Sequence, residues 1–337
     1  MRFLFVFLCA FNFLTAQDAK VNDIQYNVIV DISDSIYSVA YEVVLKGDKK
    51  KDDRVFTTHS QDSFLIVLMD DLQNLPANKR QLLCYVHGMW GGKRSNFNDA
   101  YGMLHEKYID RSESDIGRVI SIIWPGNRME YKINKSKAWE ISEPLSETFI
   151  EMLRKIQLLD AFNKKLDTGV DLIAHSLGNE LMMKVFSHVR EDEYGYRLFD
   201  EIIFTAPDLD TDVLMPEGEL QVLPYVGGRT HIYISTKDLT LGISSNLNKR
   251  DRFGLHGPIE GSEIPKNVYL VDVTKVRDEK NFGDLMTGHS YYRASEAASQ
   301  DMLRVLMSYK VEEIQKRTVR NKKQKLFILD FDKNNKG

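Results

Sequence analysis

Cysteine is nearly absent from this sequence, which has only Cys9 and Cys84 among its 337 residues. Cys9 lies in an apolar N-terminal segment that we expect to be removed, and its loss would leave a single thiol and no internal disulfide. Cys84 stands inside the apolar run Leu82–Val86. This position favours a small buried side chain over a reactive nucleophile.

The chain also lacks an excess of either charge. Its 45 Lys and Arg residues nearly balance its 49 Asp and Glu residues, for a net charge of -4, so there is no electrostatic reason to expect a nucleic acid as partner. Cys and His are not clustered at metal-ligand spacings, and no Gly-rich phosphate loop is present. We therefore expect neither a metal nor an organic cofactor, and nothing indicates an oligomeric state.

The one strongly apolar terminal run is at the start, where a single positive charge precedes Phe3–Ala16. This pattern predicts a secretory signal peptide over residues 1–16, cut near Ala16–Gln17, and an exported protein, periplasmic or extracellular. The run is too short for an ordinary membrane span, so no stable span is expected. The alternatives are an uncleaved anchor and a lipoprotein that uses Cys9. Leu14 is larger than the residue usual at the third position before a cut.

The rest of the chain predicts an α/β fold. Period-two alternation in Ile24–Val30 and Ile36–Val43 predicts an N-terminal antiparallel hairpin, and Ser63–Leu75 reads as a helix. From residue 82 onward, apolar runs alternate with helical stretches, which favours a mostly parallel sheet with helices on both faces. The expected strands are Leu82–Val86, Arg118–Ile123, Val170–Ala174, Glu201–Thr205, Thr230–Ser235 and Val268–Val273. The expected helices are Asn96–Tyr108, Glu143–Lys164, Leu177–Val189, Leu239–Asn246 and Tyr291–Lys316.

The domain organisation follows from what separates these elements. There is no internal repeat and no Pro/Gly-rich linker, so residues 17–316 are expected to form one domain. Residues 317–337 are rich in Lys and Asn and are expected to form a polar C-terminal tail. Their short apolar run Leu326–Leu329 leaves a small edge strand as the alternative.

The motif that carries chemistry is Ala174-His175-Ser176-Leu177-Gly178. A buried strand leads into Ser176 and a helix begins at once, which is the nucleophile-elbow arrangement Gly-x-Ser-x-Gly of α/β-hydrolases. Ala174 replaces the first glycine, a departure that a methyl group should tolerate. A helix N-cap serine without catalytic role is the alternative. With the hairpin and six parallel strands, the motif predicts the eight-stranded sheet of an α/β-hydrolase.

An oxyanion hole requires backbone N–H groups beside the nucleophile. We expect one from Leu177, directly after the serine, and the other from Met89 in the loop after Leu82–Val86, with Trp90 as second choice. His87, in the same loop, is expected to form structural hydrogen bonds, because a base in this fold follows the serine in the chain.

The general base is chosen among the histidines after Ser176. His188 falls in an expected helix and His231 in an expected strand, whereas His289 follows the last strand, where this fold places its base. His256, in the loop before that strand, is the alternative. The acid must orient the imidazole, and we expect it at Asp238, after the penultimate strand, with Asp208 as the alternative one strand earlier.

Taken together, these residues resemble a bacterial group described as α/β-hydrolases of unknown function. The resemblance covers about Leu82 to Arg293, and it implies the fold and a Ser-Asp-His hydrolase site without naming a substrate. Its motifs are Val86-His87-Gly88, Ile123-Trp124-Pro125, Ala174-His175-Ser176-Leu177-Gly178-Asn179, Ala206-Pro207-Asp208-Leu209-Asp210, Ser235–Asp238 and Gly288-His289-Ser290-Tyr291.

The sequence therefore predicts a serine hydrolase that forms an acyl-enzyme and cleaves a small-molecule ester, with amides and thioesters as further substrates to be considered. Trp124 and Tyr131 are candidate pocket residues, as are His87, Trp90 and His175; for Trp124 the alternative is simple packing at a strand end. Two other functions remain open. One is an inactive hydrolase scaffold used for binding, and the other is a peptidase.

Overall fold

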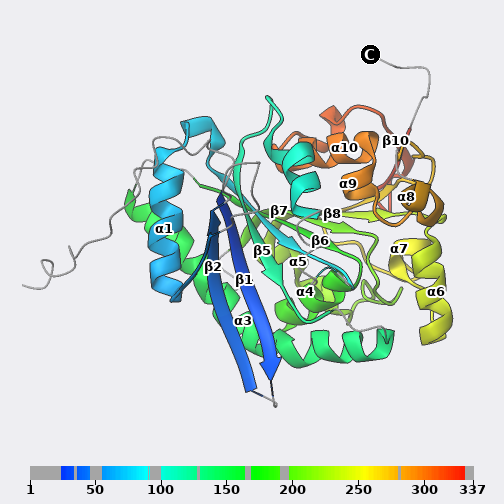
Figure 1. Ribbon diagram of the computed structural model, residues 1–337. Coiled ribbons are helices and arrows are strands. Elements are labelled where there is room, and N and C mark those ends of the chain that lie inside the picture. Colours follow the sequence, from blue (N-terminus) through cyan, green and yellow to red (C-terminus); the bar gives the residue numbers. More distant parts are fainter. Residues whose placement is uncertain are drawn as a thin grey trace, which may run out of the picture.

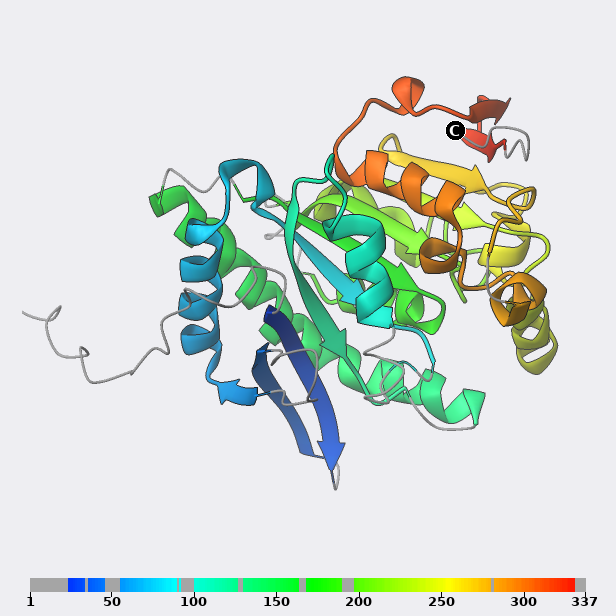
Figure 2. The same cartoon turned by 45° about the horizontal axis from the view of Figure 1, so that its top comes forward.

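The computed structural model describes residues 24–33, 36–45, 55–89, 91, 100–126, 130–163, 168–189, 197–279 and 282–330. Their strands form one sheet of 11 strands in the order β10-β11-β9-β8-β7-β6-β4-β5-β1-β2-β3. Helices lie on both sides of this twisted sheet (Figures 1 and 2). The expected signal peptide, including Cys9, and Trp90 lie outside the described residues.

The central strands are parallel and buried on both faces. In β4, Leu82, Cys84 and Val86 belong to one hydrophobic cluster, while Leu83 and Tyr85 belong to the other. Alternate side chains of a strand point to opposite faces, so a continuous apolar run serves two cores at once. The strands are β1 (Ile24–Ser33), β2 (Ile36–Leu45), β3 (Val55–His59), β4 (Gln81–Val86), β5 (Ile116–Ile123), β6 (Val170–His175), β7 (Phe199–Thr205), β8 (Gly227–Ile234), β9 (Val268–Asp272), β10 (Arg317–Asn321) and β11 (Leu326–Leu329).

Each hydrophobic cluster lies beneath its own set of helices. Side chains of α1, α3 and α4 pack in the first cluster, and those of residues 100–109, α9 and α10 pack in the second. The helices are α1 (Gln61–Asn74), η1 (Ala77–Lys79), η2 (His105–Ile109), α3 (Tyr131–Asn163), α4 (Leu177–Ser187), η4 (Glu219–Val222), α5 (Leu223–Val226), α6 (Leu239–Asn248), α7 (Phe253–His256), α8 (Phe282–Thr287), α9 (Tyr291–Ala294), α10 (Glu296–Leu306) and η5 (Val311–Glu313).

The N-terminal hairpin extends the parallel sheet. β1 pairs antiparallel with β2 and parallel with β5, which joins the hairpin to the central strands. Asp71 of α1 ties this junction together, because its carboxylate accepts hydrogen bonds from the Tyr26 hydroxyl at 2.7 Å and from Arg118 Nε at 2.6 Å. The expected hairpin and the six expected parallel strands are all present.

The strand count differs from the expected eight. β3 adds to the hairpin, and β10 and β11 add to the opposite side of the sheet. Residues 317–330 are thus not a frayed tail: β11 pairs parallel with β9, as in the edge-strand alternative. The anchor is Arg317, whose buried guanidinium donates to Asp301 at 2.6 and 2.8 Å and to the Tyr233 hydroxyl at 3.0 Å.

β10 is the outermost strand on this side. It pairs antiparallel with β11, and its register shifts between Val319 and Asn321, so that Arg320 is an extra residue in the ladder. The Arg320 guanidinium reaches back to Asp272 of β9 at 2.9 Å. Val319 is 57% exposed.

Two helices differ from expectation. The single helix expected over Tyr291–Lys316 is interrupted at Ser295, whose backbone is extended and whose hydroxyl caps α10 by accepting from the Ala298 N–H at 3.0 Å. The chain leaves the helix after Leu306 and goes on to β10. The second difference is that α3 is longer than expected. It begins at Tyr131, ahead of the expected start at Glu143, and continues through Pro144.

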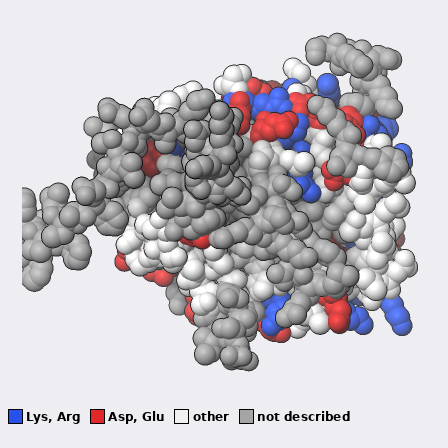
Figure 3. All heavy atoms as spheres, in the orientation of Figure 1, with Lys and Arg blue, Asp and Glu red and all other residues white. Residues whose placement is uncertain are grey.

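The surface carries both signs of charge. On the face in Figure 3, the described Lys and Arg side chains are interspersed with Asp and Glu. Of the helices in the described ranges, none has a long enough apolar stretch to cross a bilayer.

Candidate active site

Ser176 lies at a sharp turn between β6 and α4. Its backbone has φ 53° and ψ -124°, a conformation that non-glycine residues rarely adopt and that persists only where the surroundings enforce it. Hydrogen bonds hold the turn: the Ser176 N–H donates to Thr205 O at 3.0 Å, and Asn179 donates to Ser176 O from its backbone at 3.0 Å and from its side chain at 2.9 Å. This is the geometry of a nucleophile elbow.

Two glycines allow the loop after β4 to approach this turn. A Cβ on Gly178 would lie 2.5 Å from the carbonyl oxygen of His87, and one on Gly88 would lie 2.7 Å from Ser176 Cβ. Neither separation occurs in real packing, so glycine is required at both positions. Ala174, which stands where the motif has its first glycine, is fully buried and its methyl group belongs to the hydrophobic core.

Three expected residues form one hydrogen-bonded chain. Ser176 Oγ lies 2.9 Å from His289 Nε2, and His289 Nδ1 lies 2.7 Å from Asp238 Oδ2. Asp238 follows β8 and caps α6, where its Oδ1 accepts from the Leu241 N–H at 2.9 Å. With one carboxylate oxygen bound to a backbone donor, the other is held toward the imidazole.

The electrostatic environment keeps His289 basic. Its burial lowers the pKa, but the charge and hydrogen bond of Asp238 and the more distant charge of Asp208 outweigh this effect, so the pKa is above 6.5. Asp238 is only 1% exposed. An imidazolium formed at His289 would therefore have a buried carboxylate as its partner.

The alternative acid and the alternative base have side-chain partners other than His289. Asp208 Oδ1 accepts from the Ser244 hydroxyl at 2.6 Å and faces Arg252 Nη1 at 3.6 Å, so the carboxylate is engaged away from His289. His256 is half exposed and lies 3.7 Å from Asp251.

His87 braces the loop after β4. Its Nδ1 donates to Gly88 O at 2.7 Å, and its Nε2 accepts from the Trp124 N–H at 3.2 Å. Burial lowers the pKa of His87 to about 4, so the ring is neutral near pH 7. The structural role expected for His87 agrees with these contacts.

Trp124 packs behind this loop. Its indole lies parallel to the His87 ring, with centroids 5.4 Å apart, and its Nε1 donates to His87 O at 2.8 Å. The side chain is 1% exposed and does not line the cavity described below. The pocket role considered for Trp124 is therefore wrong, and the packing alternative describes it.

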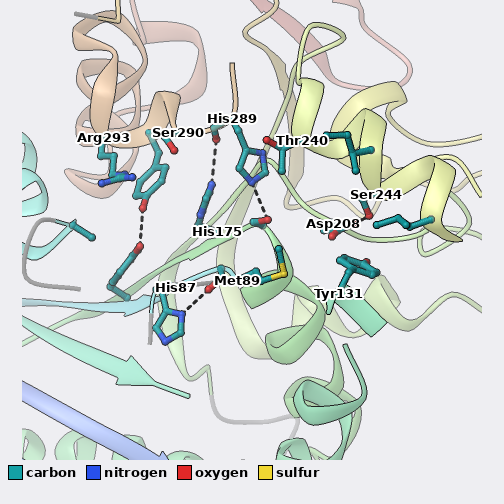
Figure 4. Close-up of a pocket in the computed structure, with 18 of the residues that line it drawn as sticks. His87, Met89, Tyr131, His175, Asp208, Thr240, Ser244, His289, Ser290 and Arg293 are labelled. Carbon is teal, nitrogen blue, oxygen red and sulfur yellow. Dashed lines mark hydrogen bonds between the residues drawn. The ribbon is translucent and has the colours of Figure 1, made fainter. Parts of the chain in front are cut away.

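His175 packs beside His289 and helps to hold it in place. Its Nε2 donates to the backbone oxygen of His289 at 3.1 Å, and its ring packs against the His289 ring at 4.7 Å and the Tyr292 ring at 4.6 Å (Figure 4). Burial, together with the charges of His289 and Arg293, lowers the pKa of His175 well below 6.5. A neutral ring can donate this hydrogen bond, and it avoids a second positive charge beside the imidazole of His289.

A cavity of about 890 Å³ opens at Ser176 and His289, and it also contains the expected residues His87, Met89, Tyr131 and His175 on its walls. Leu177, the first residue of α4, is buried beneath the serine. Its N–H lies at the helix N-terminus, where the first amides have no acceptor within the helix.

Much of the cavity wall was missed by the sequence reasoning. One face of α6 supplies Thr240, Ile243, Ser244 and Leu247, which recur at the i, i+3, i+4, i+7 spacing of one helix face. That spacing is visible in the sequence, but it does not indicate that the face is turned toward Ser176. Tyr292 of α9 was missed in the same way.

Other candidates have no part in the cavity. Cys84 is fully buried and unpaired, as expected, and burial raises the pKa of its thiol. Among the described residues, no group of His, Cys, Asp and Glu side chains is arranged to hold a metal ion.

Comparison with known proteins gives a family and distant structural neighbours. The model of the family described as "Alpha/beta hydrolase of unknown function (DUF900)" matches residues 61–306. No curated protein is similar enough in sequence to count as a relative. A poly(3-hydroxybutyrate) depolymerase from Bordetella parapertussis is 12% identical over 86% of this chain and 93% of its own, with a TM-score of 0.42. An esterase from Pyrobaculum calidifontis is 11% identical over 87% and 88%, with a TM-score of 0.37.

Proposed function

Since this chain belongs to a family of α/β-hydrolases whose reaction is undefined, we propose that it is a serine hydrolase that cleaves carboxylic esters. The observation that carries the proposal is the chain of hydrogen bonds from Ser176 Oγ through His289 to Asp238, at the wall of a cavity large enough for a small molecule.

In the first half of the reaction, Ser176 Oγ attacks the carbonyl carbon while His289 Nε2 takes its proton. The negative charge that develops on the carbonyl oxygen is stabilised by the N–H groups of Met89 and Leu177. His289 then gives the proton to the leaving alcohol, and the acyl group remains on the serine. Asp238 keeps the proton of His289 on Nδ1, so that Nε2 is free to accept.

In the second half, water takes the place of the alcohol. His289 removes its proton, the resulting nucleophile attacks the acyl-enzyme, and Ser176 is released with its proton restored while the acid departs. The triad alone does not distinguish an ester from an amide or a thioester. We favour esters over amides because an alcohol oxygen leaves far more readily than an amine nitrogen, so its departure depends less on the proton that His289 supplies.

A fluorophosphonate probe tests this function, because it reacts with activated serines. The wild-type protein should be labelled at Ser176, and the Ser176→Ala variant should fold and lose the label. Labelling that persists in the variant would refute the nucleophile, while an unlabelled, folded wild-type protein would favour the inactive-scaffold alternative. Product analysis with matched ester and peptide substrates separates an esterase from a peptidase.

We further propose that residues 1–16 direct export. N-terminal sequencing of the protein from its native host should find a start near Gln17. Recovery of intact Met1 in a cytoplasmic fraction would contradict this.

A further inference from the structure

The cavity has a polar wall beside the serine. Tyr131 at the start of α3, Asp208 after β7 and Ser244 of α6 all line the cavity that contains Ser176 (Figure 4). The Asp208 N–H donates to Ser176 O at 3.3 Å, so this wall begins at the residue that bears the nucleophile. A group held by this wall would lie in the same cavity as the reacting carbonyl.

The wall has unused hydrogen-bonding capacity. The Ser244 hydroxyl donates its hydrogen bond to Asp208 Oδ1 at 2.6 Å. Within the described residues, both side-chain contacts of the Asp208 carboxylate, to Ser244 and to Arg252, are made by Oδ1. Tyr131 is 9% exposed; its hydroxyl has the side chains of Ser244 and Asn248 as polar neighbours but makes no hydrogen bond of good geometry within the described residues. Buried polar atoms are nearly always paired in proteins, so a hydroxyl without a well-formed hydrogen bond beside a cavity is available to pair with a ligand.

The charge behind the wall selects the kind of ligand. Arg252 is fully buried, with Nη1 3.6 Å from Asp208 Oδ1 and Nη2 bonded to Asp210. This guanidinium compensates the charge of the Asp208 carboxylate, which lowers the attraction for a cation. Burial and the nearby Asp208 charge raise the pKa of the Tyr131 phenol, so it stays protonated and can donate.

We propose that Tyr131 and Asp208 form a specificity subsite for a neutral hydroxyl group, so that the preferred substrates are esters hydroxylated close to the scissile bond. The substrate hydroxyl donates to the Asp208 carboxylate, and the Tyr131 hydroxyl donates to the substrate oxygen. This inference rests on the proposed esterase function and adds the substrate class to it. A site built to pair a hydroxyl rejects a substrate that lacks one, because its own polar groups are then left unpaired.

Two pairs of nearly isosteric esters test the subsite on either half of the substrate. They are methyl 3-hydroxypentanoate with methyl 3-methylpentanoate, and 2-hydroxyethyl pentanoate with propyl pentanoate; choline pentanoate supplies a cation. Acid release is followed in a pH-stat. We expect kcat/KM to favour the hydroxylated member of at least one pair by roughly tenfold or more, and the choline ester to gain no such advantage.

Tyr131→Phe should reduce that preference roughly tenfold, since it removes one hydrogen bond to the substrate hydroxyl. The variant should fold, because this hydroxyl makes no well-formed hydrogen bond within the described residues. Asp208→Asn should reduce the preference independently. Tyr309→Phe is the matched control, since it removes a phenol hydroxyl from a 41%-exposed residue outside the cavity and should leave the preference unchanged.

The outcomes separate the two proposals. Hydrolysis that depends on Ser176 but shows no hydroxyl preference in either pair would overturn the subsite and leave the esterase function standing. The subsite is equally overturned if the preference survives in both Tyr131→Phe and Asp208→Asn, or if the choline ester is preferred. If no ester is hydrolysed and Ser176 is not labelled, the proposed function fails, and the subsite fails with it.

Discussion

Replacing Asp238 by Asn is the sharpest test of the catalytic assignment, because the structure allows the change to be nearly isolated. The Asp238 carboxylate makes two hydrogen bonds, from the Leu241 N–H to Oδ1 and with His289 Nδ1 at Oδ2. Asn has the same shape and caps a helix as well as Asp does. The fold should therefore be preserved, and only one oxygen becomes an amide NH₂ group.

The effect on turnover depends on how the new side-chain amide is oriented in the Asp238→Asn variant. The Leu241 N–H can only donate, so the amide oxygen stays beside it and the NH₂ group faces His289. His289 Nδ1 must then accept, which places the ring proton on Nε2, where it can no longer accept the proton of Ser176. We expect kcat to fall roughly ten-thousandfold, or about 5 kcal/mol of transition-state stabilisation, the scale of the same change in serine proteases.

Asp208→Asn is the matched comparison. Asp208 contacts Ser244 and Arg252 rather than the imidazole, so the tautomer of His289 is not at risk. We expect a fall in kcat of no more than about tenfold, together with a loss of stability, because the buried Arg252 loses part of its compensating charge.

Both variants are assayed as purified proteins with a chromogenic ester, with circular dichroism and thermal unfolding as checks of the fold. Folded Asp238→Asn that retains more than a tenth of wild-type kcat would refute the tautomer reasoning. The reverse ranking of the two variants would make Asp208 the acid.

Three further predictions concern the same site. In the proposed mechanism His289 acts as a base and must be neutral, and Asp238 raises its pKa, so kcat/KM should rise with pH through a midpoint above 6.5; a midpoint well below 6.5 contradicts this. Gly88→Ala places a Cβ 2.7 Å from Ser176 Cβ, so activity should fall at least about 100-fold while far-ultraviolet circular dichroism is retained; an active variant would refute the close approach. His87 has a folded pKa of about 4, so below pH 6.5 protons bind preferentially to the unfolded chain, and this residue removes about 3 kcal/mol of stability between pH 6.5 and 4. Urea unfolding at both pH values should show a smaller loss in His87→Gln, and an equal loss would contradict the assignment.

The central strands were predictable because each contains a continuous apolar run, the pattern typical of a strand that is buried on both faces. A run such as Val170–Ala174 can be buried on both faces only in a covered parallel sheet, and it lies in one. That Ser176 and His289 lie together was predictable from order and context: a strand leads into Ser176, and His289 lies between β9 and the helices α9 and α10. Asp238 was chosen over Asp208 because it follows the penultimate of the expected strands, and its hydrogen bond to His289 agrees with this choice.

Most of the cavity wall was not predictable, because it depends on side-chain directions from distant elements. Tyr131 was expected at the pocket and Asp208 was the alternative acid, but no motif indicates that Ser244 and the rest of one face of α6 join them. For Trp124, the position in the chain was interpreted correctly but the direction of the side chain was not. Its position beside a strand end is correct, but stacking on His87 turns the ring into the core.

The last strands were missed for a different reason. Composition suggests a solvated tail when charges are frequent, whereas Arg317 is buried by its pairing with Asp301. A single ion pair of this kind leaves no periodic signal in the sequence.

The position of β10 bears on whether molecules of this protein can associate with one another. An outermost strand presents unpaired N–H and C=O groups, which can template pairing with the sheet of another chain. Here the register shift at Arg320 disrupts the ladder, and the strand also carries the charges of Arg317 and Arg320. Such irregular, charged strands resist edge-to-edge aggregation. Loss of residues 317–330 would remove this protection and expose β9, a regular and mostly buried strand, as the new edge.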